Sequence, residues 1–110
     1  MPVAHIWTEA LSNAGVCSPR AAKRAIETIS QSAGVALREA LVLFAIYNSG
    51  RSQPHIGKLE RMTNVNASSQ FYVVDSLSAK GLARVSRRDG YYVFVELTDK
   101  GDALMRRCLS

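Results

Sequence analysis

The spacing of hydrophobic residues divides the first half of the chain into helical segments. Apolar residues recur every three or four positions in 3–14, 19–33 and 37–47, and a glycine or an Asn-Ser-Gly turn closes each segment. Ser18 followed by Pro19 is typical of a helix start. In 37–47 the apolar residues continue almost all the way round, as in the buried centre of a small fold. Three helices are therefore predicted, with the third at the centre.

Two shorter helices are predicted next, with a polar turn between them. The first covers 53–62 with Ser52 as its N-cap, and the second covers 67–80 with Asn66 as its N-cap and Gly81 as its end. The inward residues of the second helix are expected to be Val73, Val74 and Leu77. A short helix, a tight turn and a second helix together predict a helix-turn-helix.

After Gly81 the hydrophobic period changes from 3.6 to 2, which indicates strands. The strand-like runs cover 82–88 and 91–97, and the Asp89-Gly90 pair between them is typical of a two-residue hairpin turn. In the register that this turn predicts, the cross-strand pairs at the tip are Arg88 with Tyr91 and Arg87 with Tyr92. A hairpin directly after a helix-turn-helix is typical of the winged variant.

A last helix is predicted over 99–109, with Thr98 as its cap. The fold class is then mainly α (α+β): a winged helix-turn-helix with a two-stranded β-hairpin wing, extra N-terminal helices and a short C-terminal helix. At 110 residues the chain is expected to form a single domain. Its parts are the N-terminal helices (1–34), the winged helix-turn-helix core (35–98) and the C-terminal helix (99–110).

The positive charge is concentrated in one stretch of the sequence. The formal net charge is +5, and residues 51–88 carry seven Lys and Arg against two Asp and Glu. The segments on either side, 1–50 and 89–110, sum to +1 and −1 and so nearly cancel. A concentrated positive field favours a polyanion, either nucleic acid or an anionic membrane surface.

The sequence offers little for a membrane or for catalysis. The longest apolar run, 40–47, is far shorter than the ~20 residues of a membrane span. The N-terminus lacks the charge of a secretory signal, so a cytoplasmic protein without a membrane partner is expected. No glycine-rich phosphate loop, nucleophile elbow or zinc spacing occurs, so we expect neither an enzyme nor a cofactor or metal.

The histidines and cysteines also favour plain roles. His5 and His55 are expected at the surface. Cys17 and Cys108 are expected to be reduced, partly buried thiols, with a redox pair between them left open.

Two short segments resemble a known family. Residues 75–84 contain a helix end followed by Gly-Leu-Ala-Arg, and residues 95–101 contain Leu-Thr-Asp-Lys-Gly. With them, 37–109 resembles the multiple-antibiotic-resistance regulator (MarR) type of winged-helix repressor. The resemblance implies a sequence-specific DNA-binding regulator of transcription that acts as a homodimer. The wing departs from the family, because Asp89 is followed by Gly-Tyr and the arginine of the family's Asp-x-Arg is absent.

In such a fold the second helix reads the major groove, while the wing contacts phosphates or the minor groove. Glutamine can read adenine, and serine can reach bases or phosphates. The predicted DNA contacts are Ser52, Gln53 and Lys58 from the first helix, Ser68, Ser69, Gln70, Tyr72 and Ser76 from the second, and Arg84, Arg87 and Arg88 from the wing. For Arg84, structural support of the wing is an equal alternative, and Ser52, Ser68 and Ser69 also suit helix starts.

Apolar residues at both ends of the chain predict a dimer interface. The expected members are Ile6, Trp7, Leu11, Ile26, Leu104 and Leu109. Aromatic residues near the recognition helix and wing leave a second function open, a winged-helix protein–protein interaction module. An architectural DNA-binding subunit also fits, and RNA binding fits less well because no paired aromatic strand motif occurs. A small-molecule effector is left open.

Overall fold

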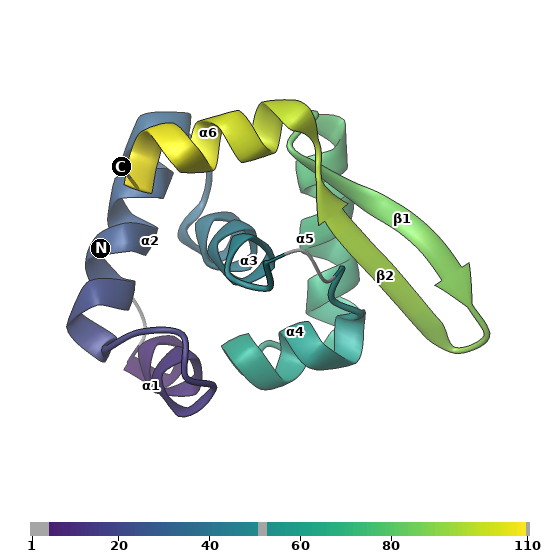
Figure 1. The fold of residues 1–110 in the computed structure, drawn as a ribbon, viewed down its shortest axis with the longest axis horizontal. Helices are drawn as coiled ribbons and strands as arrows, with labels where there is room; N and C mark the ends of the chain where they lie inside the picture. Colours follow the sequence, from purple (N-terminus) through teal and green to yellow (C-terminus); the bar gives the residue numbers. More distant parts are fainter. Residues whose placement is uncertain (1–4, 51–52, 110) are drawn as a thin grey trace.

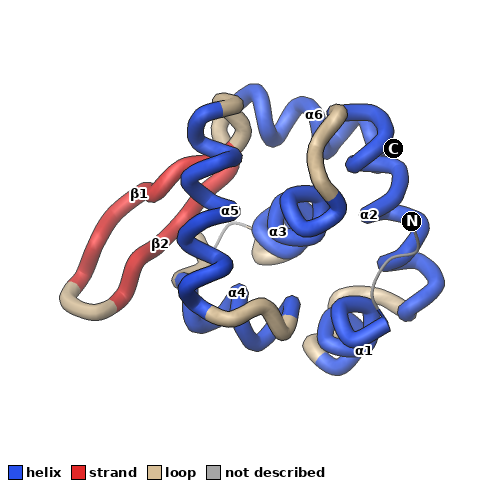
Figure 2. Tube along the Cα trace, turned by 180° about the vertical axis from the view of Figure 1, so that it is seen from behind, coloured by secondary structure: helices blue, strands red, loops and turns tan. Residues whose placement is uncertain are grey.

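Helix α3 lies at the centre of the molecule, and the other elements surround it (Figure 1). The computed structural model describes residues 5–50 and 53–109. The elements are α1 (His5–Asn13), α2 (Pro19–Ala33), α3 (Leu37–Tyr47), α4 (Ile56–Thr63), α5 (Ala67–Ala79), β1 (Ala83–Asp89), β2 (Tyr92–Leu97) and α6 (Asp99–Leu109). This order confirms the predicted mainly helical winged fold with a two-stranded hairpin, which projects beside α5 (Figures 1 and 2).

The all-round apolar character of α3 results in burial on every side. All seven residues from Ala40 to Ile46 are buried, and α2, α4, α5 and α6 pack against this helix. Val73, Val74 and Leu77 of α5 are buried as predicted. None of the described helices is by itself long and apolar enough to cross a bilayer.

Helix α4 begins three residues later than predicted. Its N-cap is His55, whose Nδ1 accepts the backbone N–H of Lys58 at 3.1 Å. The residues before the helix instead pair with the hairpin. Val95 donates its N–H to the carbonyl of Pro54 at 2.9 Å, and His55 forms an antiparallel bridge with Phe94. A backbone that is extended for this pairing cannot also be helical.

The hairpin register also differs from the prediction. The observed pairs are Asp89 with Tyr92, Arg88 with Val93 and Arg87 with Phe94. The two turn residues are therefore Gly90 and Tyr91. Gly90 has φ 60°, which suits the first position of a type II′ hairpin turn, where glycine is favoured. A β-bulge between Val85 and Arg87 places one extra residue, Ser86, in β1.

The Leu-Thr-Asp-Lys-Gly segment joins the wing to the body. Thr98 donates its hydroxyl to the carbonyl of Gly81 at 2.6 Å and its backbone N–H to the carbonyl of Leu82 at 3.1 Å. The same hydroxyl accepts the N–H of Gly101 at 3.0 Å, so Thr98 caps α6 as predicted. A Cβ at position 101 would overlap the carbonyl oxygen of Leu82, so only glycine fits there.

Candidate nucleic-acid interface

Helix α4, the N-terminal end of α5 and the tip of the wing lie along one side of the molecule, the lower side in Figures 1 and 2. Asn66 caps α5 at this end, and its Oδ1 accepts the N–H of Ser69 at 2.9 Å. The geometry is that of a helix-turn-helix whose second helix begins at an exposed edge next to a hairpin. This edge is the candidate interface.

Gln70 lies on the inner face of α5 and therefore outside the candidate interface. Its side chain is fully buried, and its Nε2 donates to the Thr63 hydroxyl at 2.7 Å and to the Val65 carbonyl at 3.3 Å. The prediction that Gln70 reads a base is therefore wrong, because its side chain holds the turn between α4 and α5 together.

Ser76 is partly buried at the edge of the interior side of α5, and its predicted DNA contact stays a prediction. Its hydroxyl donates to Oε2 of Glu39, a buried residue of α3, at 2.7 Å. Lys80 donates to both oxygens of Glu39 at 2.7 and 2.8 Å, and the N–H of Ala36 donates to Oε1 at 2.9 Å. Burial raises the pKa of the Glu39 carboxyl, but the hydrogen bonds from Lys80, Ser76 and Ala36 outweigh it and hold this pKa below its ordinary value.

The outer face of α5 is polar, small and aromatic, and it carries no lysine or arginine. Ser68 is exposed and Ser69 half-buried in the first turn. Tyr72 is 78% exposed and Phe71 37% exposed, while Asp75 lies exposed one turn further on. Ser68, Ser69 and Tyr72 are therefore placed where the sequence predicted groove contacts, and those contacts remain predictions.

The base of the wing is braced by polar contacts. Arg84 pairs with Glu96 across the two strands, with Nε 3.2 Å from Oε1. Gln53 donates to the other oxygen of Glu96 at 3.3 Å and accepts the Ser86 hydroxyl at 2.9 Å. Both ends of the Gln53 amide form hydrogen bonds within the molecule. Gln53 and Arg84 thus brace the wing, and their predicted DNA contacts stay predictions. Ser52 lies outside the described residues.

Arg87 and Arg88 point to opposite faces of the wing, because successive residues of a strand alternate. Arg87 lies opposite Phe94, and its guanidinium carbon is 4.0 Å from the centre of that ring. Arg88 lies opposite Val93, on the buried face that packs against the body of the protein. Both arginines are exposed near the tip, so the two cations approach a ligand from different sides of the hairpin.

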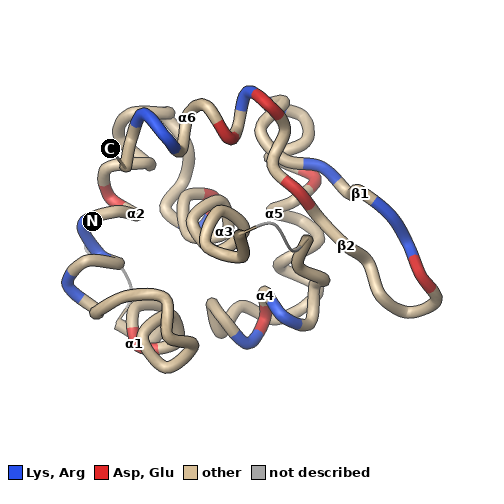
Figure 3. The backbone as a smooth tube through the Cα atoms, viewed as in Figure 1, with Lys and Arg blue, Asp and Glu red and all other residues tan. Residues whose placement is uncertain are grey.

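The sequence could not show how much of the charge in 51–88 is already neutralised. Lys80 and Arg84 form ion pairs, and Arg51 lies outside the described residues. The remaining cations of this stretch, which form no ion pair in the described part of the chain, are Lys58, Arg61, Arg87 and Arg88. They lie on α4 and on the wing, on either side of the uncharged N-terminal half of α5 (Figure 3).

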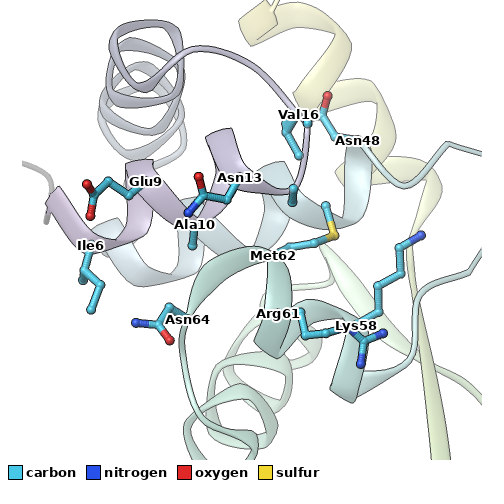
Figure 4. Close-up of a pocket in the computed structure, with 12 residues that line it drawn as sticks. Ile6, Glu9, Ala10, Asn13, Val16, Asn48, Lys58, Arg61, Met62 and Asn64 are labelled. Atoms are coloured by element: carbon cyan, nitrogen blue, oxygen red, sulfur yellow. The ribbon is translucent and has the colours of Figure 1, made fainter.

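A groove of about 760 Å³ separates α1 from α4 (Figure 4). Lys58 and Arg61 line its α4 side, and Ile6 and Glu9 line its α1 side. The two cations are one helical turn apart and thus share a face of α4. This arrangement leaves Lys58 available for the phosphate contact that the sequence predicted, with Arg61 as a second cation that the sequence analysis missed.

The predicted dimer residues divide into two groups. Leu11 and Ile26 are fully buried and Leu104 is 7% exposed, so their assignment to an interface is wrong: they form the core of the protein itself. Ile6 is 52% exposed, and Trp7 and Leu109 are partly exposed. The Trp7 ring also lies 5.9 Å from the guanidinium carbon of Arg38.

Within residues 5–50 and 53–109, no group of three or more His, Cys, Asp or Glu side chains could hold a metal ion. Cys17 and Cys108 are free thiols, and burial raises the pKa of Cys17.

Comparison with known proteins identifies the fold. Neither a protein-family model nor a curated protein matches the sequence. The chain is similar to the structure of a cysteine-to-serine mutant of MarR from E. coli, with a TM-score of 0.66 and 20% identity over 81% of this chain and 65% of that one. It is also similar to that mutant complexed with operator DNA, with a TM-score of 0.65, 20% identity and coverage of 81% and 64%.

A third similar structure is AbsC, a MarR family transcriptional regulator from Streptomyces coelicolor, with a TM-score of 0.65 and 19% identity over 87% of this chain and 65% of that one. The matched part of the chain thus spans just under two thirds of these proteins. The fold is a winged helix-turn-helix. It is MarR-like in its arrangement of helices and wing.

Proposed function

We propose that this protein binds double-stranded DNA sequence-specifically, as a homodimeric transcriptional regulator of the repressor type in the cytoplasm. Helix α5 enters the major groove through its exposed N-terminal half, and the wing contacts phosphates or the minor groove. The observation that carries this proposal is the common edge of the molecule. There the uncharged N-terminal half of α5, with small and aromatic residues, lies between the cations of α4 and those of the wing.

The division of roles follows from the chemistry of the duplex. Phosphates attract cations wherever they lie, whereas base edges are read by hydrogen bonds and apolar contacts. Lys58 and Arg61 of α4 and Arg87 and Arg88 of β1 suit the two phosphate backbones. Ser68, Ser69 and Tyr72 suit the groove between them. The fold shared with MarR, which was solved in complex with operator DNA, supports the same assignment.

The dimer is supported by less surface than the sequence predicted. Ile6, Trp7 and Leu109 remain as partly exposed apolar residues near the two ends of the chain. A dimer formed there would present two recognition helices to successive major grooves, about 34 Å apart, on an inverted repeat. Sedimentation at micromolar concentration measures this directly, and a monomer there would contradict it.

A protein–protein interaction module is the second candidate, and one observation favours it. Helix α5 has no cation, and its exposed face carries Phe71 and Tyr72. Salt distinguishes the two functions. Binding to DNA through several phosphates weakens steeply between about 50 and 200 mM salt, whereas aromatic protein contacts respond little.

The test is selection of bound duplexes from a random pool, followed by salt titration of the recovered sequence. We expect a single recovered consensus and a steep salt slope. Lys23→Ala removes one exposed charge from α2, away from the interface, and it should leave both the consensus and the salt slope unchanged. Recovery of no sequence above the starting pool would overturn the proposed function.

A further inference from the structure

The outer face of α5 lacks every side chain that commonly reads purines. Arginine and lysine read guanine, and asparagine and glutamine read adenine, through paired hydrogen bonds in the major groove. Helix α5 contains no arginine, lysine or asparagine. Its one glutamine, Gln70, is fully buried with its amide nitrogen engaged by Thr63 and Val65. Recognition by this helix therefore lacks these paired hydrogen bonds to purines.

The N-terminal part of α5, where a recognition helix contacts bases, carries two aromatic rings. Phe71 and Tyr72 lie in the second turn of α5, and the N-terminal part of such a helix contacts base edges. Tyr72 is 78% exposed, and no ring partner or hydrogen bond holds it in the described part of the chain. The one apolar group that base pairs present in the major groove is the C5 methyl of thymine.

Asp75 adds a second constraint on what can lie against α5. It is exposed three residues after Tyr72, which places both side chains on one face of the helix. A carboxylate accepts hydrogen bonds from the amino groups of adenine or cytosine, and it repels phosphates and the acceptor-only edge of guanine. Asp75 therefore suits a position over the amino group of an adenine or a cytosine, and the choice of A·T pairs rests on the aromatic rings.

We propose that α5 recognises A·T base pairs by contact between the rings of Tyr72 and Phe71 and thymine methyl groups. This inference rests on the proposed function and names the base pairs that the same surface selects. The cations of α4 and the wing hold the duplex, and the aromatic rings supply the sequence preference.

The experiment replaces thymine by deoxyuridine in the duplex recovered by selection, one position at a time and then throughout. The exchange removes only the methyl group and keeps base pairing and phosphate charge unchanged. We expect binding to weaken about four-fold for each thymine that α5 contacts, which is the value of burying one methyl group. Equal binding of the thymine and uracil duplexes would overturn the inference and leave the DNA-binding function standing.

Variants assign the effect to the helix. Tyr72→Ser should bind the thymine duplex more weakly and should not distinguish thymine from uracil at the contacted position, whereas Tyr72→Phe should still distinguish them. Tyr91→Ala is the matched control, because it removes an exposed tyrosine from the wing tip and should leave the ratio of the two affinities unchanged. Thermal unfolding checks that each variant is folded.

Two further outcomes contradict the inference in different ways. A thymine preference that survives in Tyr72→Ser and in Phe71→Ala would show that the methyl group acts through DNA shape, and it would overturn the assignment to these rings. Failure to bind any duplex would overturn both the inference and the proposed function, and it would favour a protein partner for the aromatic face.

Discussion

The two faces of α5 use similar residues for opposite purposes. On the inner face, Gln70 and Ser76 are polar, and their hydrogen bonds to Thr63 and Glu39 fix the helix to its neighbours. On the outer face, Ser68 and Tyr72 are exposed. The difference shows that the position of a polar residue around the helix, more than its type, decides whether it can meet a ligand.

The two faces also differ in what a substitution should change. Removal of an inner residue leaves buried groups without partners, so stability suffers. Removal of an outer residue leaves no buried group without a partner, so the free energy of unfolding should be unchanged while binding to the ligand changes. Substitutions on the two faces of α5 and at their contacts test this difference.

Glu39→Ala should be the most destabilising change, because Glu39 joins the start of α3 to the C-terminal end of α5. The variant leaves the Ser76 hydroxyl and the Ala36 N–H without their acceptor, although the half-exposed Lys80 can turn to water. We expect the free energy of unfolding to fall by about 2–3 kcal/mol. Urea denaturation at pH 7 measures it. Glu9→Ala, at an exposed residue, is the control and should change stability by less than about 0.5 kcal/mol.

The contribution of Glu39 should also depend on pH. Its pKa in the folded protein lies below the ordinary value of 4.5, so the folded state favours the charged form. The stabilisation is fully present above pH 4.5 and is lost as the pH falls through the lowered folded-state pKa. The stability difference between the native protein and Glu39→Gln should therefore shrink between pH 6 and pH 3. A constant difference over this range would contradict the network.

Gln70→Ala should lower the free energy of unfolding by about 1–3 kcal/mol, because the Val65 carbonyl loses a buried donor and a cavity forms. Its sequence preference in duplex selection should match that of the native protein. A changed consensus without lost stability would contradict this assignment and would indicate that Gln70 contacts DNA.

Tyr72→Ala is the matching variant on the outer face. Its stability should change by less than about 0.5 kcal/mol, and its consensus in duplex selection should differ from that of the native protein.

Arg88→Ala should change stability by less than about 0.5 kcal/mol, because the exposed side chain forms no ion pair in the described part of the chain. Binding to DNA should weaken about equally across sequences, and the slope of log affinity against log salt should fall by about one. An unchanged slope would remove Arg88 from the phosphate contacts.

The local patterns of the sequence predicted most of the fold. The hydrophobic period located the hairpin and the helices of the described residues, and Ser18, Asn66 and Thr98 cap the helices expected of them. The start of α4 was missed because Pro54 and His55 pair with β2, far along the chain at Val95 and Phe94, and no local pattern records that pairing.

The candidate site was harder to predict, since it depends on which side chains find partners inside the protein. The sequence around Glu39 does not show that Lys80, at the C-terminal end of α5, will donate a hydrogen bond to its carboxylate. Likewise, the spacing of Leu11 and Ile26 identifies an apolar face but not what covers it, and the chain's own helices cover both. The exposed residues Ser68 and Tyr72 were placed correctly because they follow from the same helical period as the core.

The β-bulge at Ser86 has a consequence for the aim of the wing. If β1 continued from Val85 in regular pairing with no bulge, Ser86 would stand opposite Phe94, and Arg87 rather than Arg88 would stand opposite Val93. The bulge thus determines which guanidinium lies on the inner side of the hairpin and which one stacks on an aromatic ring. The orientation of the two charges therefore depends on a backbone irregularity, independently of how many arginines the wing contains.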